Sequence, residues 1–131
     1  MRTLIVEDEF TGRVLMQEFL KNLGPVDLAA DGQMGVNMVR LALENRQPYD
    51  LICLDIMMPD LDGQQTLRVI REMEQDWGIY TTQRAKVVMT TSLNDRENVV
   101  NAYTGQCDGY LTKPISRQPL LDELRRLKLL A

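Results

Sequence analysis

Short apolar runs and longer amphipathic stretches alternate along this chain. Five runs have the length of a buried strand and end at polar residues or turns, at residues 3–6, 26–29, 51–54, 86–90 and 109–111. Elsewhere, apolar residues recur at helical spacing, which predicts helices over 10–23, 34–45, 63–75 and 94–103, and a last helix capped by Ser116. Strands that alternate with helices through short links are typical of an α/β fold, here a doubly wound parallel sheet of five strands with helices on both faces.

The third run leads directly into Asp55 and then into a Pro/Asp/Gly cluster. An uninterrupted apolar run predicts a strand that is covered on both faces, and Pro59 and Gly63 then end it and turn the chain. Asp55 would therefore lie at the carboxyl end of a central strand, where open α/β sheets place their chemistry. Asp62 is the expected N-cap of the helix that follows.

Composition narrows the possible functions. The 131 residues favour one domain, residues 1–131, and the net charge of −4 argues against nucleic acid or an anionic membrane as a partner. No apolar segment is long enough to span a bilayer and the two cysteines lack a CxxC spacing, so we expect a cytoplasmic protein with reduced thiols. The chain has no histidine, which excludes Ser/His/Asp and Cys/His catalysis and argues against a zinc site.

Five polar residues fall just past the ends of expected strands. Parallel strands would bring Glu7, Asp8, Asp55, Thr91 and Lys113 to one edge of the sheet. Three carboxylates in one crevice repel each other unless a cation lies between them or one is protonated. Mg²⁺ suits such a site because it takes oxygen ligands and keeps positions for water or phosphate. With a lysine and a hydroxyl near by, this set predicts phosphoryl transfer with a carboxylate as the nucleophile.

Four segments, in this order, resemble the response-regulator receiver domain family, the CheY-like fold, over essentially the whole chain. They are 4–8 (LIVED), 54–63 (LDIMMPDLDG), 89–92 (MTTS) and 108–114 (DGYLTKP). The resemblance implies a flavodoxin-like strand order, 2-1-3-4-5, and a signalling role in a two-component system rather than substrate turnover. It also implies that a sensor histidine kinase or a histidine phosphotransfer protein donates a phosphoryl group in a Mg²⁺-dependent reaction.

The same resemblance assigns an acceptor and a metal site. Asp55 is the expected phospho-acceptor. Glu7, Asp8 and Asp55, with the backbone carbonyl of Met57, are the expected Mg²⁺ ligands. The family often has an aspartate where this chain has Glu7, so a longer side chain is expected at that ligand position.

Further residues match the part of the family that responds to phosphorylation. Thr91 would bind the phosphoryl group and shift, although the local pattern alone does not separate it from Thr90. Lys113 would pair with the phosphoryl oxygens, and the bond between Lys113 and Pro114 is cis in the family. Tyr110 matches the aromatic that reports the switch to a downstream protein target, and a phosphorylation-dependent dimer is a further expectation.

The residues at particular positions argue against three other functions. An EF-hand calcium loop with Gly63 at its glycine position would need acids at Met58 and Val69. A phosphohydrolase of the haloacid dehalogenase type would form an aspartyl phosphate too, but it needs a second acid where this chain has Met57. A flavodoxin-like FMN binder would need a Ser/Thr/Gly-rich loop after the first strand, where three acids stand instead.

Two features go beyond the general family pattern. Met57 and Leu93 occupy the positions that flank the attacking water in the family, and neither orients water strongly, so we expect a long-lived phosphorylated state. The polar connection 76–84, which holds Trp77, is longer than usual. We expect it at the amino-terminal edge of the sheet, away from Asp55.

Overall fold

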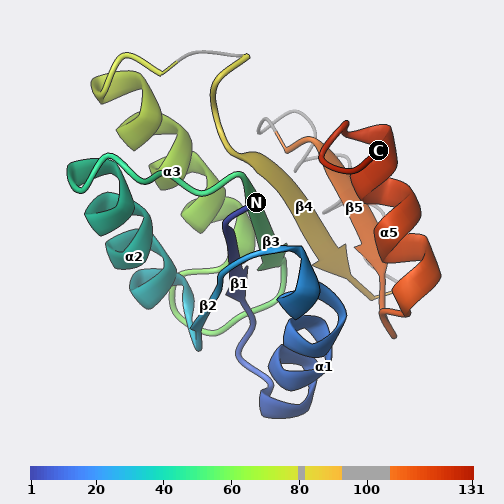
Figure 1. The fold of residues 1–131 in the computed structure, drawn as a ribbon. Helices are drawn as coiled ribbons and strands as arrows, with labels where there is room; N and C mark the ends of the chain where they lie inside the picture. The colour runs from blue at the N-terminus through green and yellow to red at the C-terminus, as the bar shows by residue number, and fades with distance from the viewer. Residues whose placement is uncertain (80–81, 93–106) are drawn as a thin grey trace.

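A five-stranded parallel sheet forms the centre of the computed structural model, which describes residues 1–79, 82–92 and 107–131 (Figure 1). The strand order is β2-β1-β3-β4-β5, and all four neighbouring pairs are parallel. Both the predicted fold class and the predicted order are confirmed. The strands are β1 (Thr3–Val6), β2 (Val26–Ala29), β3 (Leu51–Asp55), β4 (Lys86–Thr91) and β5 (Gly109–Thr112).

Helices cover both faces of this sheet. The described helices are α1 (Phe10–Leu20), α2 (Gly32–Glu44), α3 (Gly63–Asp76) and α5 (Arg117–Arg126). Figure 1 shows α1 and α5 on one face of the sheet and α2 and α3 on the other. The helix predicted over residues 94–103 lies outside the described residues.

Each face has its own apolar core, because alternate residues of the buried strands point to opposite sides. On the α1/α5 side, Met16 and Leu20 of α1 and Leu120 and Leu124 of α5 pack in one cluster with buried strand residues. On the other side, α2 and α3 pack on the remaining strand residues, and Ile70 of α3 is completely buried there. Double coverage explains why residues 4–6 of β1 and 51–54 of β3 form uninterrupted apolar runs.

Two helices differ from the prediction at their ends and faces. The first predicted helix ends at Leu20 and continues as a 3₁₀ turn, Lys21–Leu23. Leu15, an apolar residue within this predicted helix, is 41% exposed. In α2, Asp31 accepts a hydrogen bond from the Met34 N–H and begins the helix two residues earlier than predicted. Leu41, an apolar residue within this predicted helix, is exposed because the buried face of α2 follows Val36, Val39 and Leu43.

The capping predictions have mixed outcomes. Asp62 caps α3 as predicted, and its side chain and that of Gln65 form a reciprocal capping box. Ser116 stands at the N-cap position of α5 as predicted, but its side chain makes no capping hydrogen bond, so the prediction that it caps this helix is wrong.

Within the described residues, no helix is long and apolar enough to cross a membrane.

A buried ion-pair network ties α3 to the amino-terminal ends of β4 and β5. Arg71 of α3 donates to Glu74 at 2.7 Å and to Asp108 at 2.9 Å. Arg71 and Glu74 are buried, and the Asp108 side chain is 12% exposed. Asp108 also accepts from the Val87 N–H at 2.8 Å. The network holds the beginning of β4, after the connection from α3, at the edge of the sheet opposite Asp55.

Candidate functional site

The carboxyl ends of the parallel strands bring the predicted polar residues to one edge of the sheet. Glu7 directly follows β1, Asp55 ends β3, Thr91 ends β4 and Lys113 directly follows β5. Ligand oxygens of Glu7, Asp8 and Asp55 all lie within 4.8 Å of one another. These three acids, called the acid cluster below, come from two strand ends that are almost 50 positions apart in the chain.

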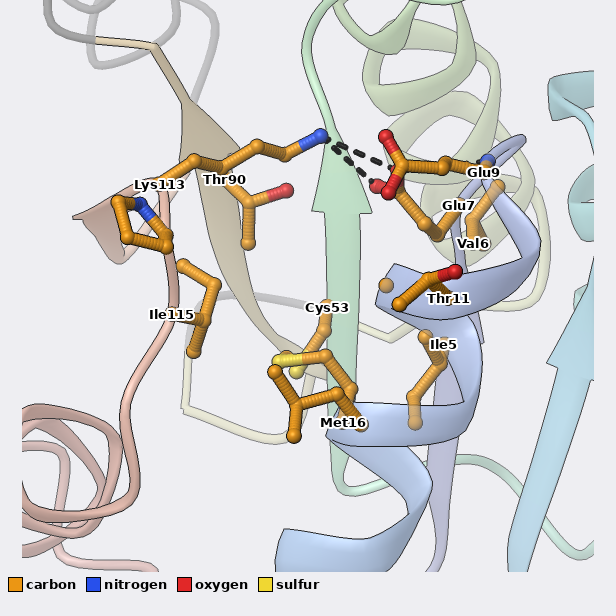
Figure 2. Close-up of a pocket in the computed structure, with 13 residues that line it drawn as sticks. Ile5, Val6, Glu7, Glu9, Thr11, Met16, Cys53, Thr90, Lys113 and Ile115 are labelled. Atoms are coloured by element: carbon orange, nitrogen blue, oxygen red, sulfur yellow. Dashed lines mark hydrogen bonds and ion pairs between the residues drawn. The ribbon is translucent and has the colours of Figure 1, made fainter.

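The Lys113 amine bridges two of the acids. Its Nζ donates to both carboxylate oxygens of Glu7, at 3.1 and 3.2 Å, and lies 3.1 Å from Oδ2 of Asp55. Figure 2 shows this side chain reaching across the end of β3 toward Glu7. Lys113 was predicted to pair with phosphoryl oxygens, and its ion pair with Glu7 is an additional contact that the sequence did not predict.

Burial makes the charges at this site interact strongly. Asp55 is 3% and Glu7 5% exposed, whereas Asp8 is exposed. Burial, and then the negative charge of Glu7, raise the pKa of Asp55 from 3.8 to about 7, although Lys113 works in the opposite direction. Burial alone would lower the pKa of Lys113, but the charges of Asp55 and Glu7 outweigh it and raise that pKa. The site therefore has an excess of negative charge that one lysine does not balance.

The loop after β3 is folded closely around Asp55. The Met57 N–H donates to Oδ1 of Asp55 at 3.1 Å, and the Gly63 N–H donates to the carbonyl of Ile56 at 2.9 Å. A Cβ on Gly63 would collide with the Asp55 carbonyl, so glycine is required for this close approach. The interpretation of residues 60–63 as a turn and helix cap, rather than a calcium loop, is consistent with this geometry.

Arg13 supports the acid cluster and was missed by the sequence analysis. Its Nη1 donates to the backbone carbonyls of Glu7 at 2.8 Å and Asp8 at 3.1 Å. It thereby fixes the segment that carries both acids against the first turns of α1. A bond from an arginine to a backbone carbonyl six residues earlier leaves no signal in the pattern of residue types.

The two threonines at the end of β4 differ in their surroundings. Thr91 is 2% exposed, its hydroxyl donates to the Ser92 carbonyl at 3.2 Å, and its own carbonyl accepts from the Lys113 N–H at 2.7 Å. The Thr90 carbonyl accepts from the Ile56 N–H at 3.0 Å, which joins β4 to the Asp55 loop. The bond between Lys113 and Pro114 is cis, as the family resemblance implied.

A cavity of about 440 Å³ opens beside Lys113, between α1 and residues 113–115 (Figure 2). Its wall is mostly apolar and includes Ile5, Met16, Cys53 and Ile115. Cys53 is buried, and burial raises the pKa of its thiol to about 12, so this thiol stays protonated and unreactive near neutral pH.

The fold and the site together define the class of the protein. The sequence pattern of the response regulator receiver domain matches residues 3–125, and the chain belongs to this family. The chain is 33% identical over 132 residues to probable histidine kinase 2 of Oryza sativa subsp. indica. That match covers 93% of this chain but only 12% of the relative, so the chain corresponds to a small part of that protein.

Solved structures agree with this assignment. The receiver domain of the sensor histidine kinase PA1611 from Pseudomonas aeruginosa, which has a magnesium ion in its active site cleft, is 29% identical with a TM-score of 0.74. The match covers 95% of this chain and 94% of that one. The Saccharomyces cerevisiae receiver domain of Ssk1, crystallised with the phosphotransfer protein Ypd1, gives a match at 26% identity and a TM-score of 0.79. It covers 94% of this chain and 85% of that one.

Proposed function

We propose that this receiver domain accepts a phosphoryl group on Asp55. The observation that carries the proposal is the position of this buried carboxylate at the end of the central strand, with the Lys113 amine 3.1 Å from its Oδ2. A carboxylate held beside a cation is placed to act as a nucleophile toward phosphorus. The same cation then faces the charge that develops on the phosphoryl oxygens.

In the proposed reaction, an Asp55 oxygen attacks the phosphorus atom of a phosphohistidine. The new oxygen–phosphorus bond replaces the nitrogen–phosphorus bond, whose electron pair leaves with the imidazole of the donor. Asp55 must be ionised to attack, so the raised pKa of this group makes its reactivity depend on what else occupies the site.

We propose Mg²⁺ as the cofactor, held by Glu7, Asp8, Asp55 and the backbone carbonyl of Met57. The donor set fits, because three carboxylates with ligand oxygens within 4.8 Å of one another offer the hard oxygen atoms that Mg²⁺ prefers. When bound, the ion supplies the positive charge that keeps Asp55 ionised and neutralises the phosphoryl oxygens. The magnesium bound by the PA1611 receiver domain supports the same choice of metal.

Thr91 and Lys113 are the proposed partners of the phosphoryl group. Both follow from the match to the family, and the hydrogen bond between the Lys113 N–H and the Thr91 carbonyl keeps their backbones together. For Lys113 to reach the phosphoryl oxygens, it must give up part of its ion pairing with Glu7 and Asp55. A metal ion on these carboxylates would favour that exchange because it competes for the same oxygens.

The proposed phosphoryl donor is a sensor histidine kinase or a histidine phosphotransfer protein. The Ssk1 receiver domain, which is similar to this chain, was crystallised with the phosphotransfer protein Ypd1. Because the chain contains no histidine, the phosphohistidine has to be supplied by another segment or another protein. We further propose a cytoplasmic location, where such donors expose their phosphohistidine.

The proposed output surface lies around Tyr110 on β5. This side chain is 42% exposed and borders a groove of about 510 Å³ that also includes Pro119 and Arg126 of α5. A downstream protein target, or a second copy in a phosphorylation-dependent dimer, would bind here. Phosphorylation would shift the population toward the conformation that the target prefers.

A signalling role is favoured over turnover of small phosphoesters. Members of the receiver domain family act in signalling. A hydrolase of the haloacid dehalogenase type would need an acid at position 57, where Met57 stands with its side chain 60% exposed. We propose that the domain promotes its own phosphorylation and dephosphorylation but has no other substrate.

Intact-mass analysis after incubation with acetyl phosphate and Mg²⁺ tests the proposal. The parent protein should gain the mass of one phosphoryl group, and Asp55→Asn should gain none. Asp122→Asn is the matched control, because Asp122 is an exposed acid on α5, and it should be labelled like the parent. No adduct on the parent, or an equal adduct on Asp55→Asn, would overturn the proposed function.

A further inference from the structure

Gly12 of α1 lies directly against the side chain of Glu7. A Cβ added at this glycine would lie 3.3 Å from both Cγ and Oε1 of Glu7 and 3.4 Å from its Cδ. Optimal contacts between carbon atoms lie at about 3.5–4.0 Å. Any other residue at position 12 would therefore place its Cβ closer to Glu7 than an ordinary contact allows, and the glutamate would have to shift by a few tenths of an ångström.

Glu7 has little freedom to move out of this space. The side chain is buried, both of its oxygens accept from Lys113 at 3.1 and 3.2 Å, and Oε1 lies 3.4 Å from the Glu9 N–H. A displacement by a few tenths of an ångström would disturb these contacts together. The position of the carboxylate is thus fixed by Lys113 on one side and by α1 on the other.

We infer that Gly12 is a positioning residue that allows a glutamate, rather than the shorter aspartate, to serve at position 7 of the acid cluster. A glutamate is longer than an aspartate by one carbon–carbon bond, about 1.5 Å. The missing side chain of Gly12 accommodates the middle of this longer side chain while its end remains at Lys113. The effect of Gly12 on Mg²⁺ binding rests on the proposed function, whereas the packing of Gly12 against Glu7 does not.

Glycine at this position needs a specific reason. Within a helix, glycine is less favourable than alanine because it leaves the unfolded chain more freedom. Among the glycines in the described helices, a Cβ at Gly63 would collide with the backbone of Asp55 and Ile56, one at Gly32 with the Thr66 hydroxyl and the Leu61 carbonyl, and one at Gly35 with the Val6 side chain. Gly12 is the glycine in these helices that is in contact with a side chain of the acid cluster.

A mutant cycle on the folded state tests the packing without metal or phosphate. Gly12→Ala is combined with the parent residue Glu7, with Glu7→Asp, which removes the methylene, and with Glu7→Gln, which keeps the length but not the charge. Urea unfolding is measured in EDTA. With Glu7→Asp, alanine should raise the folding equilibrium constant about threefold, since only the helix propensity of alanine remains. With Glu7 or Glu7→Gln, this gain should be absent or reversed. An equal effect of Gly12→Ala in all three backgrounds would overturn the inference.

Calorimetric titration with Mg²⁺ alone tests the consequence for the site. When Glu7 is present, Gly12→Ala should weaken Mg²⁺ binding about tenfold, which is at the lower end of the effects seen when a residue that supports a metal ligand is changed. In the Glu7→Asp background, Gly12→Ala should leave the Mg²⁺ affinity unchanged. If the parent binds Mg²⁺ and is phosphorylated but Gly12→Ala weakens Mg²⁺ binding equally in both backgrounds, the inference about Gly12 fails while the proposed function stands. If the parent neither binds Mg²⁺ nor gains a phosphoryl group, the proposed function fails. The unfolding measurements still test whether Gly12 accommodates the Glu7 side chain.

Discussion

The raised pKa of Asp55 predicts that this residue destabilises the metal-free protein at neutral pH. In the unfolded chain the carboxyl has its ordinary pKa of 3.8, and in the folded protein its pKa is about 7. Between these values the folded state binds more protons than the unfolded state. Stability must therefore fall as the pH rises through this interval, and the full penalty is present above pH 7. Asp55→Asn removes the ionisation with little change in shape, so it should remove this pH dependence.

The size of the effect follows from the two pKa values. The interval from 3.8 to about 7, at about 1.4 kcal/mol per pH unit, corresponds to about 4 kcal/mol at full ionisation. Part of this penalty is already present at mildly acidic pH, because the unfolded carboxyl ionises first. Between pH 5.5 and 8.0, which avoids the sequence pI near 4.8, the remaining change is about 2 kcal/mol.

Urea unfolding of the parent and of Asp55→Asn in EDTA at these two pH values measures this change. When the pH is raised, the free energy of unfolding of Asp55→Asn should increase by about 2 kcal/mol relative to that of the parent, whatever the difference between the two proteins at pH 5.5. Asp122→Asn, at an exposed acid, should show no such change. A constant difference between Asp55→Asn and the parent at both pH values would refute the electrostatic argument, and so would a change of opposite sign.

Three further substitutions test other contacts. Arg71→Met should lower the free energy of unfolding by about 3–5 kcal/mol, because it leaves the buried Glu74 carboxylate without its cation and leaves Asp108 with Arg84 alone. Arg125→Met, at an exposed ion pair, should lower it by less than about 1 kcal/mol, and equal costs in urea unfolding would refute this. Tyr49→Phe should cost about 1 kcal/mol, because the hydroxyl donates to Asp27 at 2.7 Å, and an unchanged urea midpoint would contradict that. Met57→Asn should shorten the lifetime of the phosphorylated protein on the order of tenfold, as followed by intact mass, because an amide can orient the attacking water; an unchanged decay would disprove it.

The sheet was predictable because its strands carry strong local signals. The apolar runs of β1 and β3 are long enough, and sharply enough bounded by acids or turn residues, to be located within a residue. Helix faces were less predictable where apolar residues surround the axis. Leu15 has helical spacing to Phe19, and only the tertiary packing shows that Met16 and Leu20 face the sheet instead. Leu41 lies two residues from both Val39 and Leu43, so it could not share their face of α2.

The site residues were predictable as a set but not in their contacts. The topology alone brings Glu7, Asp55 and Lys113 to one edge of the sheet. It does not reveal that Lys113 is shared between the two acids, because that depends on side-chain length and burial. The contribution of Arg13 was not foreseeable either, since it acts through backbone carbonyls, which every residue has.

The Lys113–Glu7 ion pair joins two residues that are 106 positions apart in the chain. No fragment that lacks either the first or the last strand can assemble the site, and a partly folded chain would present its carboxylates to water singly. Reactivity of Asp55 toward a phosphoryl donor would then report on completion of the whole sheet, and labelling in increasing urea should follow the global unfolding curve. If Asp55 is the acceptor, as proposed above, only molecules with a complete sheet would become phosphorylated.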